Sequence, residues 1–515
     1  MSFGSKKPAP EPLPMGQPTH RLSTNESARP VPYLAGRQRV ALSFISDVWN
    51  QAAYPVVANF GKKKTISGYN YFGSFLTMIG CGPFDALHDL YYNGDSVYTE
   101  ATPIYAASLT FSSTTGLATF GTSAPHGRTT GESVVIRGAV EGDYNGPATI
   151  TVTDANHFTY PVIGSPAVNA TGVVYALIVL PPVERGAETE VNILVPNFGP
   201  LLLQWGTETQ VTPAKVNESG VLHPNQRGIG RIFFDQSFLG FNQKNVQNLE
   251  GVLSRFPQQD WLELDPIEGD CNPIAFICDV LQNPRQGGRA PTSKIDTVTM
   301  LATAAQLAEE GLGFSPLILR QQSAMQILND ALEYIDGYFT INAAGQLGVK
   351  LARRPADDLP EITDADLTAR AEFAPEDWST VKTGCTVFFT NRDAGFNKDA
   401  SRPFKDMAAL SARGEPDHLY IEKPWFTRKA VANAYAISMG RMMALPSVTG
   451  QLKLRQRGTL FDDLLPGALF RLNISTRTLP YTIFRVTGRE WPDPARPEFS
   501  ISFKVDRSYL HAPIV

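Results

Sequence analysis

Three pairs of carboxylates are the residues whose types and spacing could support acid–base chemistry. A glycosidase needs two carboxyl groups beside the scissile bond, one acting as an acid and the other as a base or nucleophile. The pairs are Asp357-Asp358, Asp364/Asp366 and Asp462-Asp463. Each pair lies in a predicted loop next to Pro or Gly, where side chains usually face water. We therefore interpret all three as solvated turn residues rather than as a catalytic pair.

The histidines and cysteines form no pattern that would bind a metal or activate a nucleophile. His223 precedes a proline, so we expect it to have a structural role, while His126 and His157 lie in a separate β-rich segment. No CxxC pair occurs, and no cysteine has a histidine at metal-ligand spacing. Cys271 and Cys278 lie seven residues apart on a predicted helix, and we expect them to be buried apolar residues. The remaining cysteines are Cys81 and Cys385.

Motifs that carry catalysis or bind a cofactor are absent from the sequence. It contains no GxSxG, HExxH or GxxxxGK[ST] motif, and no GxGxxG follows a predicted strand. A hydrolase would need acids, bases or a nucleophile that converge in a pocket. The sequence therefore predicts no catalytic, cofactor-binding or metal-ligating residue, and it indicates a protein that is not an enzyme.

Composition points to a multidomain β-rich chain. At 515 residues the chain is too long for one core, and its 42 Gly and 39 Pro favour strands and turns over long helices. Only 18% of the residues are charged, and 29 are Phe. This balance fits a subunit that buries surface against neighbours, or simply a larger core than usual.

The net charge argues against DNA binding. The chain carries a net charge of -5, and its only basic clusters, KKPAP and Gly61–Thr65, are short and predicted to be solvated loops. A duplex-binding surface needs clustered cations. The sequence therefore predicts no sequence-specific nucleic-acid binding.

The amino-terminal segment has no apolar stretch of signal-peptide length, and no run of about 18 apolar residues occurs anywhere in the chain. We expect synthesis in the cytoplasm and a soluble protein until it assembles. Residues 1–31 are rich in proline, which blocks helices and central strands. The proline content of this segment therefore predicts an extended arm.

Residues 104–178 differ from their surroundings, with few charges and many Ser, Thr, Gly and Val. Period-2 alternation in ATITVTD and FTYPV predicts half-buried strands, and Asn145-Gly146 predicts a turn between strands. This segment is expected to be a small β-domain inserted into the parent fold, with short linkers.

Helices are predicted between residues 266 and 375 and again near 430. The first runs from Pro273 to Leu281, a second from Thr303 to Glu310, and a third begins after the N-cap Ser323. A hairpin of YFTIN and QLGVKLA follows the third. A later helix, TRKAVANAYAISMGRMMAL, is predicted to be capped by Thr427.

The last third of the chain returns to strands. Met439, Met442 and Met443 are interpreted as core filler rather than as a binding groove. The segments TGQLKLRQRG, GALFRLNI, YTIFRVTG and EFSISFKVD predict a sequential set of strands that would close as a barrel or sandwich.

Several motifs, weak singly, together resemble the tail hub and tail-tip proteins of long-tailed bacteriophages, including lambda-like tip attachment proteins and baseplate hubs. They are WGTETQ (205–210), HPNQRGIGRIFFDQSFLG (223–240), NLEGVLSRF (248–256), PYLAGRQRVALSFISDVW (32–49), the segment 70–98, EDWSTVKTGCTVFFTNRD (376–393) and LFDDLLPGALFRLNI (460–474). The chain departs from the family's Cys-Glu-Gly-Pro by reading Cys81-Gly82-Pro83. That departure removes one charge but keeps the turn.

The resemblance implies a mainly β, multidomain β-barrel hub with an α+β module and an inserted small β-domain. The expected divisions are an extended Pro-rich arm at 1–31, a first hub β-barrel region at 32–103 and 179–265, the inserted β-domain at 104–178, an α+β hub module at 266–375, and a second hub β-barrel region with one helix at 376–515.

The same resemblance implies a structural virion protein. Its expected form is a homotrimeric central hub that closes the distal end of the tail tube, at the tail tip or baseplate, and adapts sixfold tube rings to a threefold tip during attachment and genome ejection. Expected partners are the distal tail protein ring or tail tube, the carboxyl terminus of the tape-measure protein, and other tip and fibre proteins, with only indirect contact to the host envelope.

Two alternatives are retained. A host-recognition protein would bind surface polysaccharide through an exposed groove in residues 104–178, where Tyr144, Phe158 and Tyr160 are available, although the alternation pattern places Phe158 or Tyr160 in the core. A tail-tip cell-wall hydrolase would need the acid–base residues that the sequence lacks.

Overall fold

The computed structural model describes residues 30–515 with the exception of 61–62, 99–100, 127, 129, 132, 163, 165, 167, 180–182, 187–188, 196–197, 243–245, 343, 354–358, 457–463, 476–481, 491–497, 511–513 and 515. Nearly all of the predicted arm at 1–31 therefore lies outside the described residues. The carboxylate pairs Asp357-Asp358 and Asp462-Asp463 also lie outside them.

The chain is mainly β, which confirms the predicted fold class: strands hold 43% of the residues and helices 19%. It divides into two compact units. Among the described residues, the first unit holds 30–31 and 39–254, and the second unit combines 32–38 with 255–515. No helix in the described part of the chain is long and apolar enough to cross a membrane.

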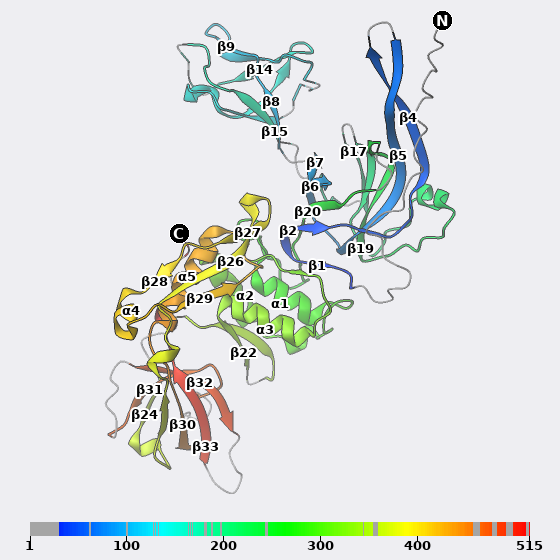
Figure 1. Ribbon diagram of the computed structural model, residues 1–515. Coiled ribbons are helices and arrows are strands. Elements are labelled where there is room, and N and C mark those ends of the chain that lie inside the picture. Colours follow the sequence, from blue (N-terminus) through cyan, green and yellow to red (C-terminus); the bar gives the residue numbers. More distant parts are fainter. Residues whose placement is uncertain are drawn as a thin grey trace, which may run out of the picture. The chain divides into compact units, whose positions relative to one another are not determined.

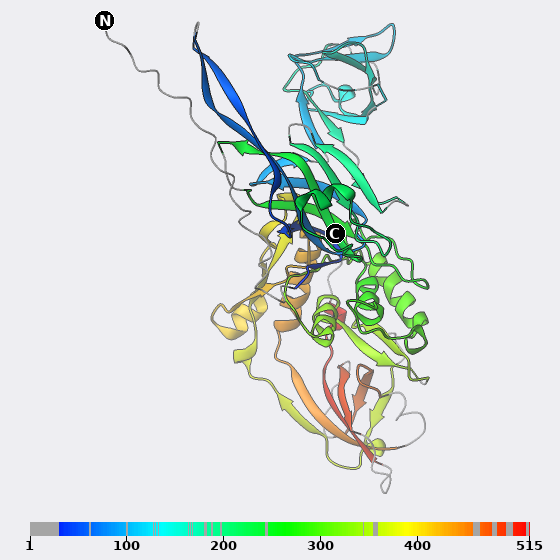
Figure 2. The same cartoon turned by 90° about the vertical axis from the view of Figure 1, so that its right-hand side faces the viewer.

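The first unit is built on a large antiparallel sheet in the order β17-β18-β19-β5-β3, with β4 also paired to β5. These strands are β3 (Ser43–Phe44), β4 (Trp49–Phe60), β5 (Lys63–Cys81), β17 (Glu190–Val195), β18 (Gly199–Gln204) and β19 (Ile229–Phe241). Figures 1 and 2 show β4 and β5 side by side as a long ribbon. Phe75 and Phe234 stack at 4.6 Å between ring centroids on the adjacent strands β5 and β19, and both are fully buried. The next residues along each strand, Leu76 and Phe233, belong to a separate buried cluster, so both faces of the sheet carry apolar residues here.

A second sheet has the order β16-β6-β20-β2, with β7 paired to β6. Its strands are β2 (Gly36–Ala41), β6 (Ala86–Tyr92), β7 (Asp95–Tyr98), β16 (Val183–Glu184) and β20 (Leu249–Arg255). Asn93 and Gly94 join β6 to β7 with positive φ angles of 54° and 88°. This is the backbone that a tight hairpin of twisted strands requires, and Asn-Gly adopts it readily.

The segment between Ala101 and Val179 forms two four-stranded sheets, β13-β14-β10-β9 and β12-β11-β15-β8. They consist of β8 (Ala101–Tyr105), β9 (Ser108–Ser112), β10 (Leu117–Gly121), β11 (Ser133–Arg137), β12 (Gly146–Thr149), β13 (Thr151–Val152), β14 (His157–Pro161) and β15 (Tyr175–Val179). Residues of both sheets share one core, in which Phe120 and Phe158 stack at 4.7 Å. The first and last strands, β8 and β15, pair with each other, so the chain enters and leaves this segment side by side.

The turn predicted at Asn145-Gly146 is different in the structure. Asn145 has an extended backbone with φ of −84°, and Gly146 begins β12. The Asn145 side chain instead bonds both the N–H and the carbonyl of Ala139, at 3.2 and 2.8 Å. Local side-chain bonding of this kind competes with a hairpin turn.

The second unit contains one large core that joins helices and strands. Its elements are β1 (Tyr33–Leu34), α1 (Pro273–Gln282), α2 (Thr297–Glu309), β21 (Leu317–Ile318), α3 (Ala324–Ile335), β22 (Gly337–Ile341), β23 (Leu347–Leu351), β26 (Gly384–Asn391), β27 (Asn397–Ala400), β28 (Phe404–Lys405), α4 (Met407–Arg413), β29 (His418–Glu422) and α5 (Lys429–Met443). Phe276 of α1, Val387 of β26 and Tyr435 of α5 belong to this same core. It therefore extends across the division that the sequence predicts between residues 375 and 376.

The helix boundaries follow their caps. Asn272 accepts a hydrogen bond from the Ile274 N–H at 3.0 Å and begins α1, and Ser323 caps α3 as predicted. The helix predicted from Thr303 begins earlier, at Thr297, because Asp296 accepts from the Thr299 N–H. The predicted cap Thr427 is wrong, since α5 follows Arg428 and has no side-chain cap.

The carboxyl-terminal strands form one six-stranded sheet in the order β24-β31-β32-β33-β30-β25. They are β24 (Glu361–Thr363), β25 (Glu372–Pro375), β30 (Val448–Arg455), β31 (Leu469–Asn473), β32 (Ile483–Glu490) and β33 (Glu498–Val505). The four predicted strands β30 to β33 are thus confirmed, but β30 pairs with β33 rather than with β31. Buried residues from strands along this single sheet meet in one core, among them Ile362, Leu452 and Phe484. The sheet must therefore curl around its own apolar face, as a half-barrel does.

Candidate functional site

The motif at residues 205–240 surrounds a buried arginine. Arg231 has no exposed surface, and its hydrogen-bond partners among the described residues are neutral oxygens. Nε donates to Gln204 Oε1, Nη1 donates to the Pro224 carbonyl at 3.1 Å, and Nη2 donates to Thr212 Oγ1 at 3.2 Å. Gln204 in turn donates to Glu190 Oε2 at 2.7 Å. Burial lowers the pKa of Arg231 to about 10, so it stays charged and holds these oxygens in place.

A second polar side chain closes the same loop. Gln210 is fully buried and accepts from the Gly206 N–H at 3.0 Å. Its amide donates to the carbonyls of Asn225, Gln226 and Ile229, at 3.1, 2.9 and 3.0 Å. Buried polar groups that are all paired fix a backbone in one conformation. Residues 206–228 are therefore a rigid loop, with Leu222 exposed by 91%.

Asp270 is the centre of a network in the second unit. Its carboxylate has no exposed surface and accepts from Ser315 Oγ at 2.7 Å, from Thr427 Oγ1 at 2.5 Å and from Arg428 Nε at 2.9 Å. The same guanidinium reaches the exposed Glu268 carboxylate at 2.5 Å. The Thr427 hydroxyl thus donates its hydrogen bond to Asp270, which explains why Thr427 does not cap α5. The network ties the segments before α1 and α5 together.

Residues 32–38, called the strap below, are anchored in the second unit by a buried triad. The Tyr33 hydroxyl donates to Asp279, and Arg255 Nη2 reaches the same carboxylate at 2.9 Å. Arg255 also donates to the Leu34 carbonyl at 3.0 Å. Gly36 has φ of +77°, and a Cβ there would meet Ser315 Oγ at 2.1 Å. The strap thus fits only with glycine at this position.

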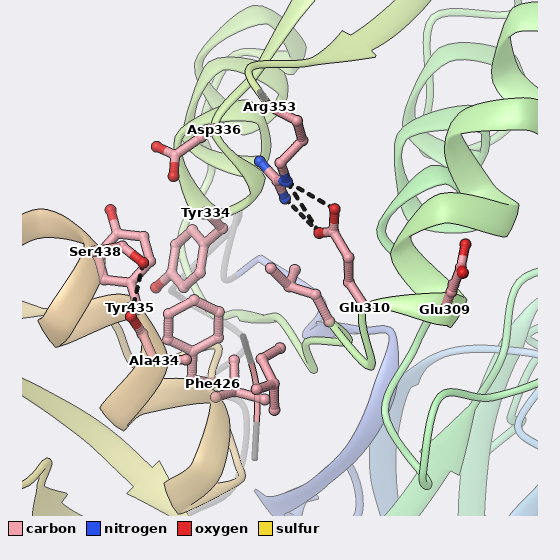
Figure 3. Close-up of a pocket in the computed structure, with 12 residues that line it drawn as sticks. Glu309, Glu310, Tyr334, Asp336, Arg353, Phe426, Ala434, Tyr435 and Ser438 are labelled. Carbon is pink, nitrogen blue, oxygen red and sulfur yellow. Dashed lines mark hydrogen bonds and ion pairs between the residues drawn. The ribbon is translucent and has the colours of Figure 1, made fainter. Parts of the chain in front are cut away.

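A cavity of about 340 Å³ opens in the second unit between α3, α5 and the end of α2. Figure 3 shows Glu310 and Arg353 facing each other across one side, with Tyr435 and Asp336 on the other. Arg353 Nη2 pairs with Glu310 Oε2 at 2.7 Å, and its Nε reaches both oxygens of that carboxylate. Tyr334, Phe426 and Tyr435 contribute aromatic walls. The site combines apolar surface with oriented oxygen atoms.

Of the carboxylates that the sequence singled out, the described ones, Asp364 and Asp366, are both bonded within turns. Asp366 accepts from the N–H and the hydroxyl of Thr363, at 2.9 and 2.8 Å, and closes a capping box. Asp364 accepts from the Ser475 N–H at 2.7 Å. The carboxylates of Asp364 and Asp366 therefore both stabilise turns. No cluster of His, Cys, Asp or Glu that could hold a metal occurs among the residues that the structure describes.

The histidines have local structural contacts. Burial and the Arg231 cation lower the pKa of His223, whose carbonyl accepts from Thr212 Oγ1 at 3.2 Å. His126 Nδ1 accepts from the Arg128 N–H at 3.0 Å. His157 pairs with Asp154 at 3.0 Å in the turn before β14. The rings of His126 and His157 are thus tied to their own loops, whereas His223 is held through its backbone carbonyl.

All four cysteines are free and buried. Burial raises the pKa of Cys278 to about 12 and that of Cys385 to about 11. The expected buried role is confirmed for Cys271 and Cys278, but Cys271 lies before the cap of α1 rather than on the helix. Burial also raises the pKa of Cys271, so these three thiols stay protonated at neutral pH.

Met439 packs against the large core of the second unit, as predicted, whereas Met442 and Met443 are not core filler. Met439, Met442 and Met443 line an open cavity of about 560 Å³ beside β32 and β33, and Met443 is 37% exposed. Arg507 crosses the end of α5 there and donates to the carbonyls of Met442 and Leu445, at 2.6 and 2.7 Å. The helix end is thus satisfied by a cation, as the helix dipole favours.

No sequence pattern predicted the polar networks or the cavity residues Asp336 and Tyr435. Arg428 and Asp270 lie 158 residues apart, so no local pattern relates them. A usable signal is a charged residue next to apolar residues, as in Gly230-Arg231-Ile232-Phe233 and in the sequence before Cys271. Such a charge is expected to need a buried partner.

Comparison with protein-family models gave no match, and comparison with curated proteins gave none either. Among solved structures, a chain of the virion of the native gene transfer agent (GTA) particle is similar over 98% of this chain and 91% of its own, with a TM-score of 0.51 and 14% identity. The tail protein from Neisseria meningitidis MC58 covers 78% of this chain and 97% of its own, at 9% identity and a TM-score of 0.31. The 43 kDa tail protein of prophage MuSo2 from Shewanella oneidensis covers 82% and 99%, at 11% identity and a TM-score of 0.30. The first comparison shows that this chain shares the fold of a virion protein, while the other two superpose too loosely to support an argument.

Proposed function

We propose that this chain is a structural virion protein, the subunit of a trimeric hub at the distal end of a phage tail. The observation that carries the proposal is the similarity in fold, across nearly the whole of both chains, to a chain of the GTA virion. In this role the protein adapts the sixfold tail tube to a threefold tip and opens for genome ejection. Its partners are the distal tail protein ring or tube, the tape-measure protein and other tip proteins.

The construction of the first unit supports an assembly role. The loop at 206–228 is fixed by buried Gln210 and Arg231, yet it presents Val221 and Leu222 to solvent with exposures of 59% and 91%. A loop whose backbone is already fixed loses little backbone entropy when a partner covers it. Such a loop suits a protein that docks in one geometry.

No observation on the described residues supports either alternative function. Tyr144, Phe158 and Tyr160, the aromatic residues considered for polysaccharide binding, are all buried in the core of their β-domain. Asp364 and Asp366, the described carboxylates considered for hydrolysis, are bonded within turns. We therefore propose neither polysaccharide recognition nor wall hydrolysis.

Electron microscopy of intact particles tests the proposal. Antibody fragments against the β-domain at 101–179 should label the end of the tail, and averaged images should contain three copies of this fold per tail. Labelling along the tube, in the head or on no virion structure would refute the virion hub. Six copies at the tip would keep the tail position and refute the trimer.

A further inference from the structure

Two strand edges that have no backbone partner among the described residues border one cavity of the second unit. The cavity measures about 410 Å³ and lies between β21, α3 and the end of β29. This volume is within the range of pockets that bind ligands, about 300–1,000 Å³. Strand edges with free N–H and C=O groups pair readily with another extended chain. The cavity therefore has the backbone chemistry of a peptide-binding site.

The first open edge belongs to β29. Lys423, just after this strand, donates its N–H to the Phe388 carbonyl of β26 at 2.8 Å. Backbone groups of successive residues point to opposite sides of a strand, so those of Tyr420 and Glu422 point away from β26. No described residue forms a backbone hydrogen bond with Tyr420 or Glu422 on that side. Glu422 lines the cavity, which places this edge at its wall.

The second open edge belongs to β21. The Ala35 N–H donates to the Pro316 carbonyl at 3.1 Å, so the backbone of Pro316 faces β1. The Ser315 N–H donates to the Trp425 carbonyl at 2.8 Å, on the opposite side. By the same alternation, the N–H and C=O of Leu317 face the side of Trp425, where no described residue bonds them. Leu317 and Trp425 both line the cavity, so an extended chain that enters it meets donors and acceptors on two sides.

The side chains of the lining fit a peptide that carries both charge and apolar groups. Ile318, Ile421 and Trp425 supply apolar surface. Asp330 and Arg320 lie in the same lining, and neither forms an ion pair with another described residue. Complementary charges fix the register of a bound partner. A matching segment therefore carries one charge of each sign beside an apolar residue.

One segment of this chain has that composition. Residues 19–28, THRLSTNESA, carry Arg21, Leu22 and Glu26. They contain no proline, so every residue can donate an N–H to a strand edge. The segment lies outside the described residues. Its sequence makes it the candidate occupant.

The position of β1 favours a segment from a neighbouring copy. Tyr33 pairs with Ile318 on one side of β21, whereas the open edge of β21 is on the other side. Pro30 and Pro32 have no N–H and cannot extend β1 along β21. An extended chain spans about 3.3 Å per residue, so residue 19 can lie roughly 45 Å from Tyr33. That reach is long enough to arrive at another subunit.

We propose that residues 19–28 of a neighbouring copy bind in this cavity as an added strand, between the open edges of β21 and β29. The proposal rests on the proposed assembly only for the presence of a neighbouring copy. Peptide binding by the isolated chain would stand even if particle images refuted the trimer, and its failure would leave the virion role untouched.

Fluorescence anisotropy with a labelled peptide of residues 18–29 tests the site in the full chain. The peptide should bind, and Glu422→Pro, which removes one edge N–H, should weaken binding about fivefold, the usual effect of one net hydrogen bond. Proline is tolerated where the N–H of an edge strand is unpaired, so the variant should fold. Glu422→Ala is the matched control, because it loses the same side chain, 71% exposed, but keeps the N–H. It should bind the peptide as the parent chain does.

A proline in the peptide gives a second test that leaves the protein unchanged. Thr24→Pro removes a donor from the middle of the segment and should weaken binding by more than about fivefold. Equal binding of the parent and Thr24→Pro peptides overturns the proposal, as does equal binding by folded Glu422→Pro and Glu422→Ala chains. Absence of parent-peptide binding at millimolar concentration overturns it as well.

Disulfide trapping tests whether the segment comes from a neighbouring copy. A Ser23→Cys chain mixed with a Gln322→Cys chain should form a covalent heterodimer, because Gln322 is exposed and lines the cavity. Glu415→Cys, at a side chain 75% exposed and outside the cavity, is the control and should give several times less. The four native cysteines are buried and do not compete. If a chain with both Ser23→Cys and Gln322→Cys closes on itself in dilute solution, the segment binds its own chain and the assignment to a neighbouring copy is wrong.

Discussion

Replacing Asp270 by Asn tests whether its buried network holds the second unit together. The carboxylate is fully buried and faces Arg428, whose side chain is only 9% exposed. The substitution keeps the size of the side chain but leaves the guanidinium without a buried anion. Breaking a buried ion pair from one side typically costs about 3–5 kcal/mol. For a unit of this size, that loss lowers the melting temperature by roughly 6–20 °C.

Glu268→Gln is the matched control, because Glu268 pairs with the same guanidinium at 2.5 Å but is 73% exposed. An exposed ion pair contributes about 0–1 kcal/mol, so this variant should melt within roughly 4 °C of the parent protein. Differential scanning calorimetry at neutral pH measures both variants. If the two substitutions shift the transition by the same small amount, then burial does not determine the strength of this pair and the reasoning fails.

Four further outcomes are expected. Gly36→Ala should destabilise the second unit by at least about 2 kcal/mol in urea unfolding, whereas Gly345→Ala, which shares the positive φ but meets no atom within 4 Å, should cost about half as much. Burial and the nearby Arg231 cation lower the pKa of His223 below 6.5, so an opened loop binds the proton more tightly than the closed one. The hydrogen-exchange protection factors of residues 206–228, which correct for the pH dependence of intrinsic exchange, should therefore be constant above pH 6.5 and fall as the pH drops below it, but not in a His223→Gln variant. A thiol reagent should modify none of the four buried cysteines in the native protein and all four in denaturant. Deleting residues 101–179 and closing the gap with a short Gly/Ser linker should leave soluble protein, since β8 and β15 pair side by side; insoluble protein would mean that the segment belongs to the parent core.

The local features of the fold were predictable because their causes are local. Ser323 caps α3, and the strands β30 to β33 alternate apolar and polar residues in steps of two. The core residues Phe158 and Tyr160 follow the same alternation in β14. In each case the residue and the structure that it favours are neighbours in the sequence.

The failed predictions share a different cause. Thr427 has the right residue type for a cap near the start of α5. Its hydroxyl instead donates a hydrogen bond to Asp270, which lies 157 residues away in the sequence. Likewise, Met443 follows the helical period and yet faces an open cavity, because β32 and β33 do not cover it. Contacts with residues distant in the sequence determine where these side chains lie. No local sequence pattern could therefore predict their positions. The candidate cavity was missed for the same reason.

The strap has a consequence for the order in which the protein is completed on the ribosome. Residues 32–38 are made near the start of synthesis, but Gln38 bonds the carbonyl of Ser315, 277 residues later. The first unit emerges in full between these two events. It can therefore fold before the residues that bond the strap have been synthesised. Once folded, that unit brings its two ends together and shortens the free loop that the strap must close. A folding defect in the first unit therefore delays the closure of the second, even though no residue of the second unit has changed.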